Sequence, residues 1–160
     1  MNSFKRWVGF ALLLFAAQSG FAQDRAPLVG VWRLVSFERE FQGSDEREYP
    51  MGKVPSGYIQ FTAEGRMTVV ITAEGRKAPA TDADRAALYN TLVAYTGGYR
   101  VDGDKWITKV EVSANPAWVG TEQTRNFKVA GDRLQEITAW MTRPDNKVAR
   151  AVITYERSKS

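Results

Sequence analysis

The chain has 160 residues, which is enough for one domain and too few for two comfortable ones. It contains neither cysteine nor histidine, which excludes disulfides, thiolate and imidazole catalysis, and zinc or copper sites of the usual kind. The formal net charge is only +4 and the basic residues are scattered, so a nucleic-acid partner has no support.

The first 22 residues have the three-part pattern of a secretory signal peptide. Lys5 and Arg6 precede an apolar run over residues 7–17, and the small residues Gly20 and Ala22 stand where a signal peptidase reads. The run is about half as long as the roughly 20 residues of a membrane span, and no later stretch reaches that length. An N-terminal anchor or a buried core helix is the alternative. We expect cleavage after Ala22, a mature domain over residues 23–160, and a periplasmic or secreted location.

Apolar patterns bounded by turn residues predict eight strands in the mature chain. Most neighbouring strands are joined by short turns, and Asp102-Gly103 is a strong two-residue hairpin signal. The predicted strands cover residues 30–41, 58–62, 66–72, 99–101, 105–113, 121–129, 133–142 and 147–157.

One segment has a helical period instead. Thr81 is a candidate N-cap followed by acidic residues, and Leu88, Leu92 and Tyr95 follow at i, i+4 and i+7. The two glycines at 97–98 are expected to stop this helix. The pattern predicts a helix over residues 82–96, between strands 3 and 4.

Eight successive antiparallel strands can remove both exposed sheet edges by closing on themselves. Eight is also the strand number at which a barrel interior just holds side chains or one small ligand. The predicted fold is therefore all-β, an eight-stranded antiparallel up-and-down barrel, with a two-sheet sandwich as the alternative. The helix would lie across one barrel opening or along its wall, where it is placed to act as a lid.

A set of short motifs runs through the chain from residue 30 onward. Gly30-Val31-Trp32 opens the first predicted strand of the mature domain, as a Gly-x-Trp motif does in lipocalins. Further motifs follow in order: YPMG at 49–52, PSGYI at 55–59, FTAEGRM at 61–67, AYTGGY at 94–99 and NPAWVGTEQ at 115–123. Their order and spacing resemble the bacterial and fungal lipocalin-like domain family over nearly the whole mature chain.

This resemblance implies a calycin-type barrel and leaves the activity open. It also implies that Trp32 closes the narrow end of the barrel beneath an arginine, for which Arg125, Arg150 and Arg157 are candidates. Family members often carry histidines just before a Val-Glu-x-Ser stretch. Here Thr108-Lys109 occupy those positions, so any histidine-dependent chemistry of relatives is absent.

Strand parity points to a polar group inside the barrel. Counting by two places Gln123 and Arg125 on the same face as Phe127 and Val129, whose side chains favour the interior. A buried arginine needs a partner, and Glu111, Glu136, the Trp32 ring and the acidic head of a ligand all remain open.

Aromatic residues are abundant in the predicted strands, and each taken singly is more often plain core. Together with the inward arginine, they predict one ligand-binding cavity. The predicted lining is Tyr58, Tyr99, Trp118, Gln123, Arg125 and Trp140.

The first functional hypothesis is an exported lipocalin-like protein that holds a small apolar or amphipathic ligand, with an acidic head group as one option. The second is a cavity enzyme of isomerase or cyclase type, without histidine or cysteine chemistry. The third is a protein-binding calycin, such as an inhibitor, that acts through its loops. No metal is expected because the chain lacks imidazole and thiolate ligands, and no nucleotide cofactor is expected because no glycine-rich phosphate loop precedes a helix.

Overall fold

The computed structural model describes residues 25–159. The predicted signal peptide and its cleavage site lie outside the described residues. Within this part of the chain, no helix has the length and apolar character of a membrane span.

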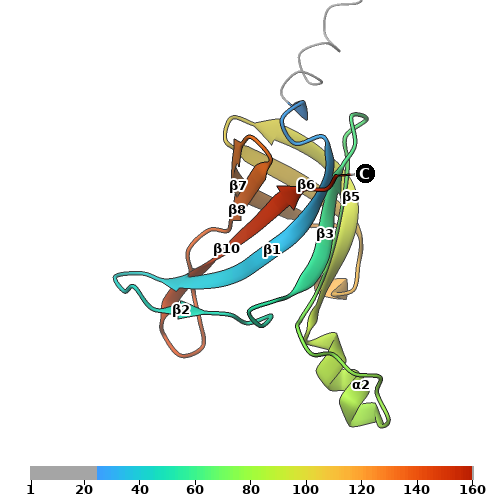
Figure 1. The fold of residues 1–160 in the computed structure, drawn as a ribbon, viewed down its shortest axis with the longest axis vertical. Coiled ribbons are helices and arrows are strands. Elements are labelled where there is room, and N and C mark those ends of the chain that lie inside the picture. The colour runs from blue at the N-terminus through green and yellow to red at the C-terminus, as the bar shows by residue number, and fades with distance from the viewer. Residues whose placement is uncertain (1–24, 160) are drawn as a thin grey trace, which may run out of the picture.

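Eight longer strands form the wall of the barrel (Figure 1). Each pairs antiparallel with its neighbour, and β10 returns to pair with β1 from Trp32–Arg157 to Phe41–Ala149. This pairing confirms the predicted closed barrel and rules out the sandwich. The eight strands are β1 Gly30–Phe41, β3 Ser56–Phe61, β4 Arg66–Thr72, β5 Leu92–Asp102, β6 Lys105–Ser113, β7 Glu122–Ala130, β8 Arg133–Ile137 and β10 Val148–Arg157.

Two short strands and a 3-10 turn were not predicted. β2 Arg47–Glu48 pairs with β1, and β9 Met141–Thr142 pairs with β10. The predicted strand over 133–142 is therefore interrupted after Ile137, and the loop before β7 contains the 3-10 helix η1 Pro116–Trp118. The interruption after Ile137 breaks the inside–outside alternation on which the sequence prediction relied.

The helix α2 Asp82–Tyr89 lies between β4 and β5, the third and fourth strands of the wall, as predicted. It begins at the predicted cap, where Thr81 and Asp84 exchange side chain–backbone hydrogen bonds of 3.1 and 2.9 Å. The predicted end at residue 96 is wrong. Leu92 instead starts β5 and pairs with Thr72 of β4. Pairing with β4 stabilises this segment more than a further exposed turn of helix would, because a helix gains most of its stability from packing.

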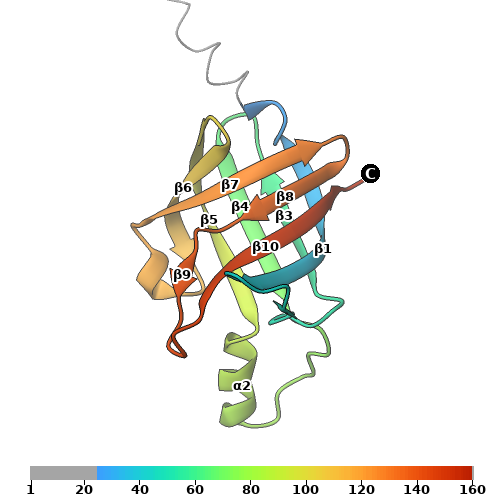
Figure 2. The ribbon, with the colours of Figure 1, turned by 90° about the vertical axis from the view of Figure 1, so that its left-hand side faces the viewer.

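The position of α2 also differs from the predicted lid. The helix buries no side chain, and it projects beyond the end of the barrel opposite to residues 25–29 (Figures 1 and 2). Leu92 and Tyr95 belong to the barrel wall and do not belong to the helix. The two ends of the barrel are therefore different, and we call them the Trp32 end and the α2 end.

At the Trp32 end, Trp32 is fully buried and its indole Nε1 donates to the Leu28 carbonyl oxygen at 2.7 Å. The Arg157 guanidinium lies 4.1 Å from the centre of the indole ring, so Arg157 is the arginine that packs on Trp32. Arg150 instead stacks on Trp140, 4.5 Å from the ring centre. The Gly-x-Trp tryptophan thus seals one end of the barrel.

Aromatic rings fill the half of the barrel near Trp32. Phe61, which pairs with Gly30, makes edge contacts with Tyr99 at 5.0 Å and with Trp106 at 5.1 Å between ring centres. Trp106 in turn packs on Phe127. The remaining space inside the barrel lies towards the α2 end.

Candidate functional site

A cavity of about 80 Å³ lies inside the barrel, in the half nearer α2. Most of its wall is apolar, and its polar groups come from β5, β7, β8, β10 and from Thr138, which follows β8. The lining residues are Phe37, Val69, Ile71, Val93, Tyr95, Trp118, Arg125, Glu136, Thr138, Ala151, Ile153 and Tyr155.

A buried ion pair forms the polar side of this cavity. The Arg125 Nε donates to Glu136 Oε1 at 2.9 Å, and the two side chains are only 16% and 5% exposed. Glu136 also accepts a hydrogen bond from the Tyr155 hydroxyl at its Oε2, at 3.0 Å. Since both carboxyl oxygens accept from donors, the geometry is that of the ionised carboxylate. Arg125 and Glu136 therefore compensate each other's charge.

The guanidinium of Arg125 is held from its other sides as well. One terminal nitrogen donates to the Thr124 carbonyl oxygen at 2.9 Å, and the other donates to Gln123 Oε1 at 3.2 Å. The Gln123 amide in turn donates to the Thr121 hydroxyl at 3.1 Å. The arginine is thus fixed by its own strand, as well as by Glu136.

Tyr95 from β5 completes the polar cluster, which we define as Tyr95, Arg125, Glu136 and Tyr155. Its side chain is 6% exposed, and its ring meets Trp118 edge-on at 5.5 Å between ring centres. Its hydroxyl oxygen lies beside the Arg125 side chain, which can only donate to it, and no hydrogen bond among the described residues uses the Tyr95 O–H as a donor. The Tyr155 hydroxyl, in contrast, donates to Glu136. The cluster therefore presents one free O–H donor to the cavity.

Burial dominates the ionisation of this cluster. It raises the pKa of Tyr95, and the nearby Glu136 carboxylate raises it further against the opposing effect of Arg125. Burial likewise raises the pKa of Tyr155 well above its ordinary value and raises that of Glu136, although Arg125 and Tyr155 oppose the latter shift. Both tyrosines are therefore neutral hydrogen-bond donors at physiological pH.

The structure brings only part of the predicted site together. Trp118 and Arg125 line the cavity, and Gln123 lies behind Arg125 as its hydrogen-bond partner. The Tyr99 ring is in the aromatic core near Trp32, and its hydroxyl donates to the Thr62 carbonyl oxygen at 3.1 Å.

Two predicted residues lie outside the barrel interior. Tyr58 is 51% exposed because it alternates with Ile59, which is fully buried and takes the inward position on β3. Trp140 is 40% exposed and lies in the interruption between β8 and β9, where strand parity no longer applies. Neither side chain lines the cavity.

Two members of the polar cluster, Tyr95 and Tyr155, were not predicted. The helical pattern places Tyr95 in the helix, whereas alternation along the last strand is enough to place Tyr155 inside the barrel. Of the two acids left open as partners of Arg125, Glu136 is the one that faces inward. Glu111 instead pairs with Arg66 on the barrel exterior at 3.0 Å, with both side chains about half exposed.

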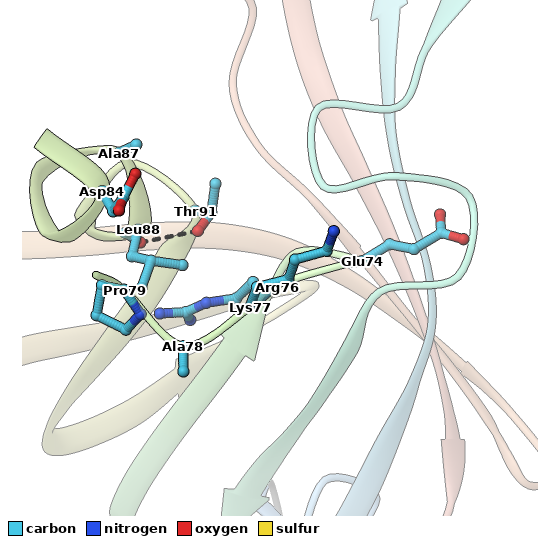
Figure 3. Close-up of a pocket in the computed structure, with 10 residues that line it drawn as sticks. Glu74, Arg76, Lys77, Ala78, Pro79, Asp84, Ala87, Leu88 and Thr91 are labelled. Carbon is cyan, nitrogen blue, oxygen red and sulfur yellow. Dashed lines mark hydrogen bonds between the residues drawn. The ribbon is translucent and has the colours of Figure 1, made fainter. Parts of the chain in front are cut away.

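A larger hollow, of about 430 Å³, lies outside the barrel between α2 and the loop that precedes it (Figure 3). Charged and small residues line it, and the Glu74 carboxylate points away from the helix. There Glu74 accepts hydrogen bonds from the backbone N–H groups of Lys53 and Val54 at 2.9 and 3.1 Å. Because its polar groups do not converge on a common point, we place the candidate site in the smaller cavity within the barrel.

Comparisons with known proteins identify a family and similar solved structures. The family described as lipocalin-like domain matches residues 29–158. A crystal structure of an uncharacterized protein from Bacteroides eggerthii is similar with a TM-score of 0.40 and 12% sequence identity, covering 79% of this chain and 98% of that one. No curated protein matches the chain.

Proposed function

This chain belongs to the family of lipocalin-like domains, and from that premise we propose that it binds a small, largely apolar ligand in the cavity of its barrel. The observation that carries the proposal is the buried polar cluster at the side of an otherwise apolar cavity. Small-molecule sites are mostly apolar walls with a few placed polar groups that fix the orientation of the ligand.

The cavity limits the size of the ligand. Its volume of about 80 Å³ is below the roughly 300–1,000 Å³ of sites for drug-sized molecules. A ligand that fits is therefore small, or it leaves part of its apolar body at the α2 end. Trp118 and Val93 flank the cavity on that side and would contact such a body.

The polar cluster supports binding in preference to plain core packing. A buried ion pair is weak in its net contribution to stability, and apolar residues of similar volume often replace one without loss. Burying the charges of Arg125 and Glu136 costs desolvation free energy, and aliphatic side chains at the same positions would stabilise the fold equally well. Its position on the cavity wall, beside a free tyrosine donor, is the arrangement of a binding site.

A titration with toluene, followed by saturation-transfer NMR, tests this proposal. Toluene is expected to bind saturably to the wild-type protein. The variant Ala151→Leu should weaken this binding because Ala151 lines the cavity and the larger side chain fills it. Ala130→Leu is the matched control, since Ala130 is exposed on β7. Equal binding by all three proteins, or no saturable binding by the wild type, would contradict the proposal.

Export is the second part of the proposal, and the pattern of the first 22 residues supports it. We expect the mature protein to begin at or next to Gln23 and to be periplasmic or secreted. N-terminal sequencing of the protein from fractionated cells is the test. A chain that still begins at Met1 in every fraction would contradict export.

A further inference from the structure

The Tyr95 hydroxyl is the polar group of the cluster that lacks an acceptor. Tyr95 is 6% exposed and lines the cavity beside Arg125 and Glu136, so its hydroxyl belongs to the polar side that a ligand would meet. Its ring is held on β5 and against Trp118, with its hydroxyl beside Arg125 and Glu136. A ligand that fills the cavity leaves this donor unpaired unless it supplies an acceptor, and an unpaired buried donor costs free energy. The cavity therefore selects for a ligand with an acceptor at this point.

The acceptors around Tyr95 already have donors. Glu136 accepts a hydrogen bond from Arg125 at Oε1 and one from Tyr155 at Oε2, and Gln123 Oε1 accepts one from Arg125. A ligand hydroxyl would bring a further donor into this group, whereas a carbonyl brings an acceptor alone. A carbonyl oxygen therefore matches the donors and acceptors of the cluster better than an alcohol does.

The charge of the cluster is also balanced before any ligand arrives. Arg125 and Glu136 are 2.9 Å apart and nearly buried, so their charges cancel in an environment of low dielectric constant. An incoming carboxylate would meet the Glu136 carboxylate and leave the cavity with a net negative charge. An incoming ammonium group would leave it with a net positive charge. Both are unfavourable in a buried site.

We infer that the ligand of this cavity carries an uncharged carbonyl oxygen, which accepts a hydrogen bond from the Tyr95 hydroxyl. Its apolar body lies against the apolar lining, which includes Ile71, Val93 and Ile153. Ketones, esters and amides with a small apolar substituent form this class. The inference rests on the proposed function, because it names the chemistry of the ligand for the same cavity.

Three probes of nearly equal shape separate the alternatives. Cyclohexyl methyl ketone carries the carbonyl acceptor, cyclohexanecarboxylate carries a negative charge, and isopropenylcyclohexane carries neither. Their affinities are measured by NMR titration for the wild type, for Tyr95→Phe and for the control Tyr99→Phe. Tyr99 is a suitable control because its hydroxyl donates to Thr62 in the aromatic core and does not line the cavity.

We expect Tyr95→Phe to weaken ketone binding roughly two- to tenfold, which is the range for one hydrogen bond. Binding of isopropenylcyclohexane should stay unchanged, and Tyr99→Phe should alter neither. The carboxylate should bind to the wild type at least tenfold more weakly than the ketone. This last comparison needs no variant, so it stands even if Tyr95→Phe folds poorly.

The outcomes distinguish this inference from the proposed function. If the ketone and the hydrocarbon respond equally to Tyr95→Phe, the carbonyl assignment is overturned while the binding function stands. If the carboxylate binds most tightly, the charge-balance reasoning is overturned in the same way. If none of the three probes binds, the proposed function fails and the inference fails with it.

Discussion

Removing Arg125 alone is expected to destabilise the barrel more than removing Arg125 and Glu136 together. In Arg125→Met the Glu136 carboxylate, which is 5% exposed, keeps only the Tyr155 hydroxyl as a donor. Leaving one partner of a buried ion pair uncompensated typically costs about 3–5 kcal/mol. The variant Arg125→Met/Glu136→Met removes both charges and approximately keeps the volume. Its main remaining cost is the Tyr155 hydroxyl without an acceptor, about 1–3 kcal/mol.

Urea unfolding at neutral pH, followed by tryptophan fluorescence, measures both free energies of unfolding. The double variant should be more stable than Arg125→Met by about 1–3 kcal/mol, with similar denaturant dependence. This ordering follows from the burial of the pair and is the opposite of simple additivity. A double variant no more stable than Arg125→Met would refute the reasoning, because it would show that the unpaired Glu136 carboxylate costs nothing.

Three further predictions concern the ends, the wall and the ionisation of the barrel. Trp32→Ala is expected to cost about 3–5 kcal/mol because Trp32 is fully buried, and a melting temperature within a few degrees of wild type would contradict its sealing role. Gly97→Ala should cost about 1–3 kcal/mol because a Cβ would collide with the Lys109 carbonyl oxygen, whereas the neighbouring Gly98→Ala, with its nearest atom at 3.7 Å, should cost less in the same urea titration. Burial raises the pKa of Glu136 in the folded protein above its ordinary value of 4.5. The contribution of Glu136 to the free energy of unfolding is therefore fully present below pH 4.5 and is lost as the pH rises through the raised pKa. The advantage of wild type over Glu136→Gln in urea unfolding should therefore shrink from about pH 4 to about pH 7, and a growing advantage would show that pairing with Arg125 outweighs burial.

The barrel could be predicted from the sequence because its signals are local. Hairpin turns such as Asp102-Gly103 and alternation such as that over 58–62 each describe one or two strands, and closure follows from their number. The inward direction of Arg125 was predictable for the same reason, since it shares parity with Phe127 along β7. These features depend on a single strand and its immediate neighbour.

The rest of the site depends on contacts that a single sequence does not display. Leu92 and Tyr95 fit a helical stripe as well as a strand, and the pairing of β5 with β4 decides between them. The ring of Tyr58 makes it a candidate for the site, but Ile59 holds the inward position on β3. The prediction is therefore limited where a segment fits both a helical and a strand pattern, and where the face on which a strand residue lies depends on its pairing.

The binding of a ligand inside the barrel is tested most directly by the isoleucine methyl groups. The chain contains five isoleucines, and of these Ile71 and Ile153 line the cavity. Ile59 lies in the core away from the cavity, while Ile107 and Ile137 face away from the buried positions of β6 and β8.

Titration of methyl-labelled protein with cyclohexyl methyl ketone should shift the Ile71 and Ile153 signals and leave the Ile107 signal unchanged. Shifts confined to Ile107 and Ile137, or no shift at saturating ketone, would contradict binding in the cavity.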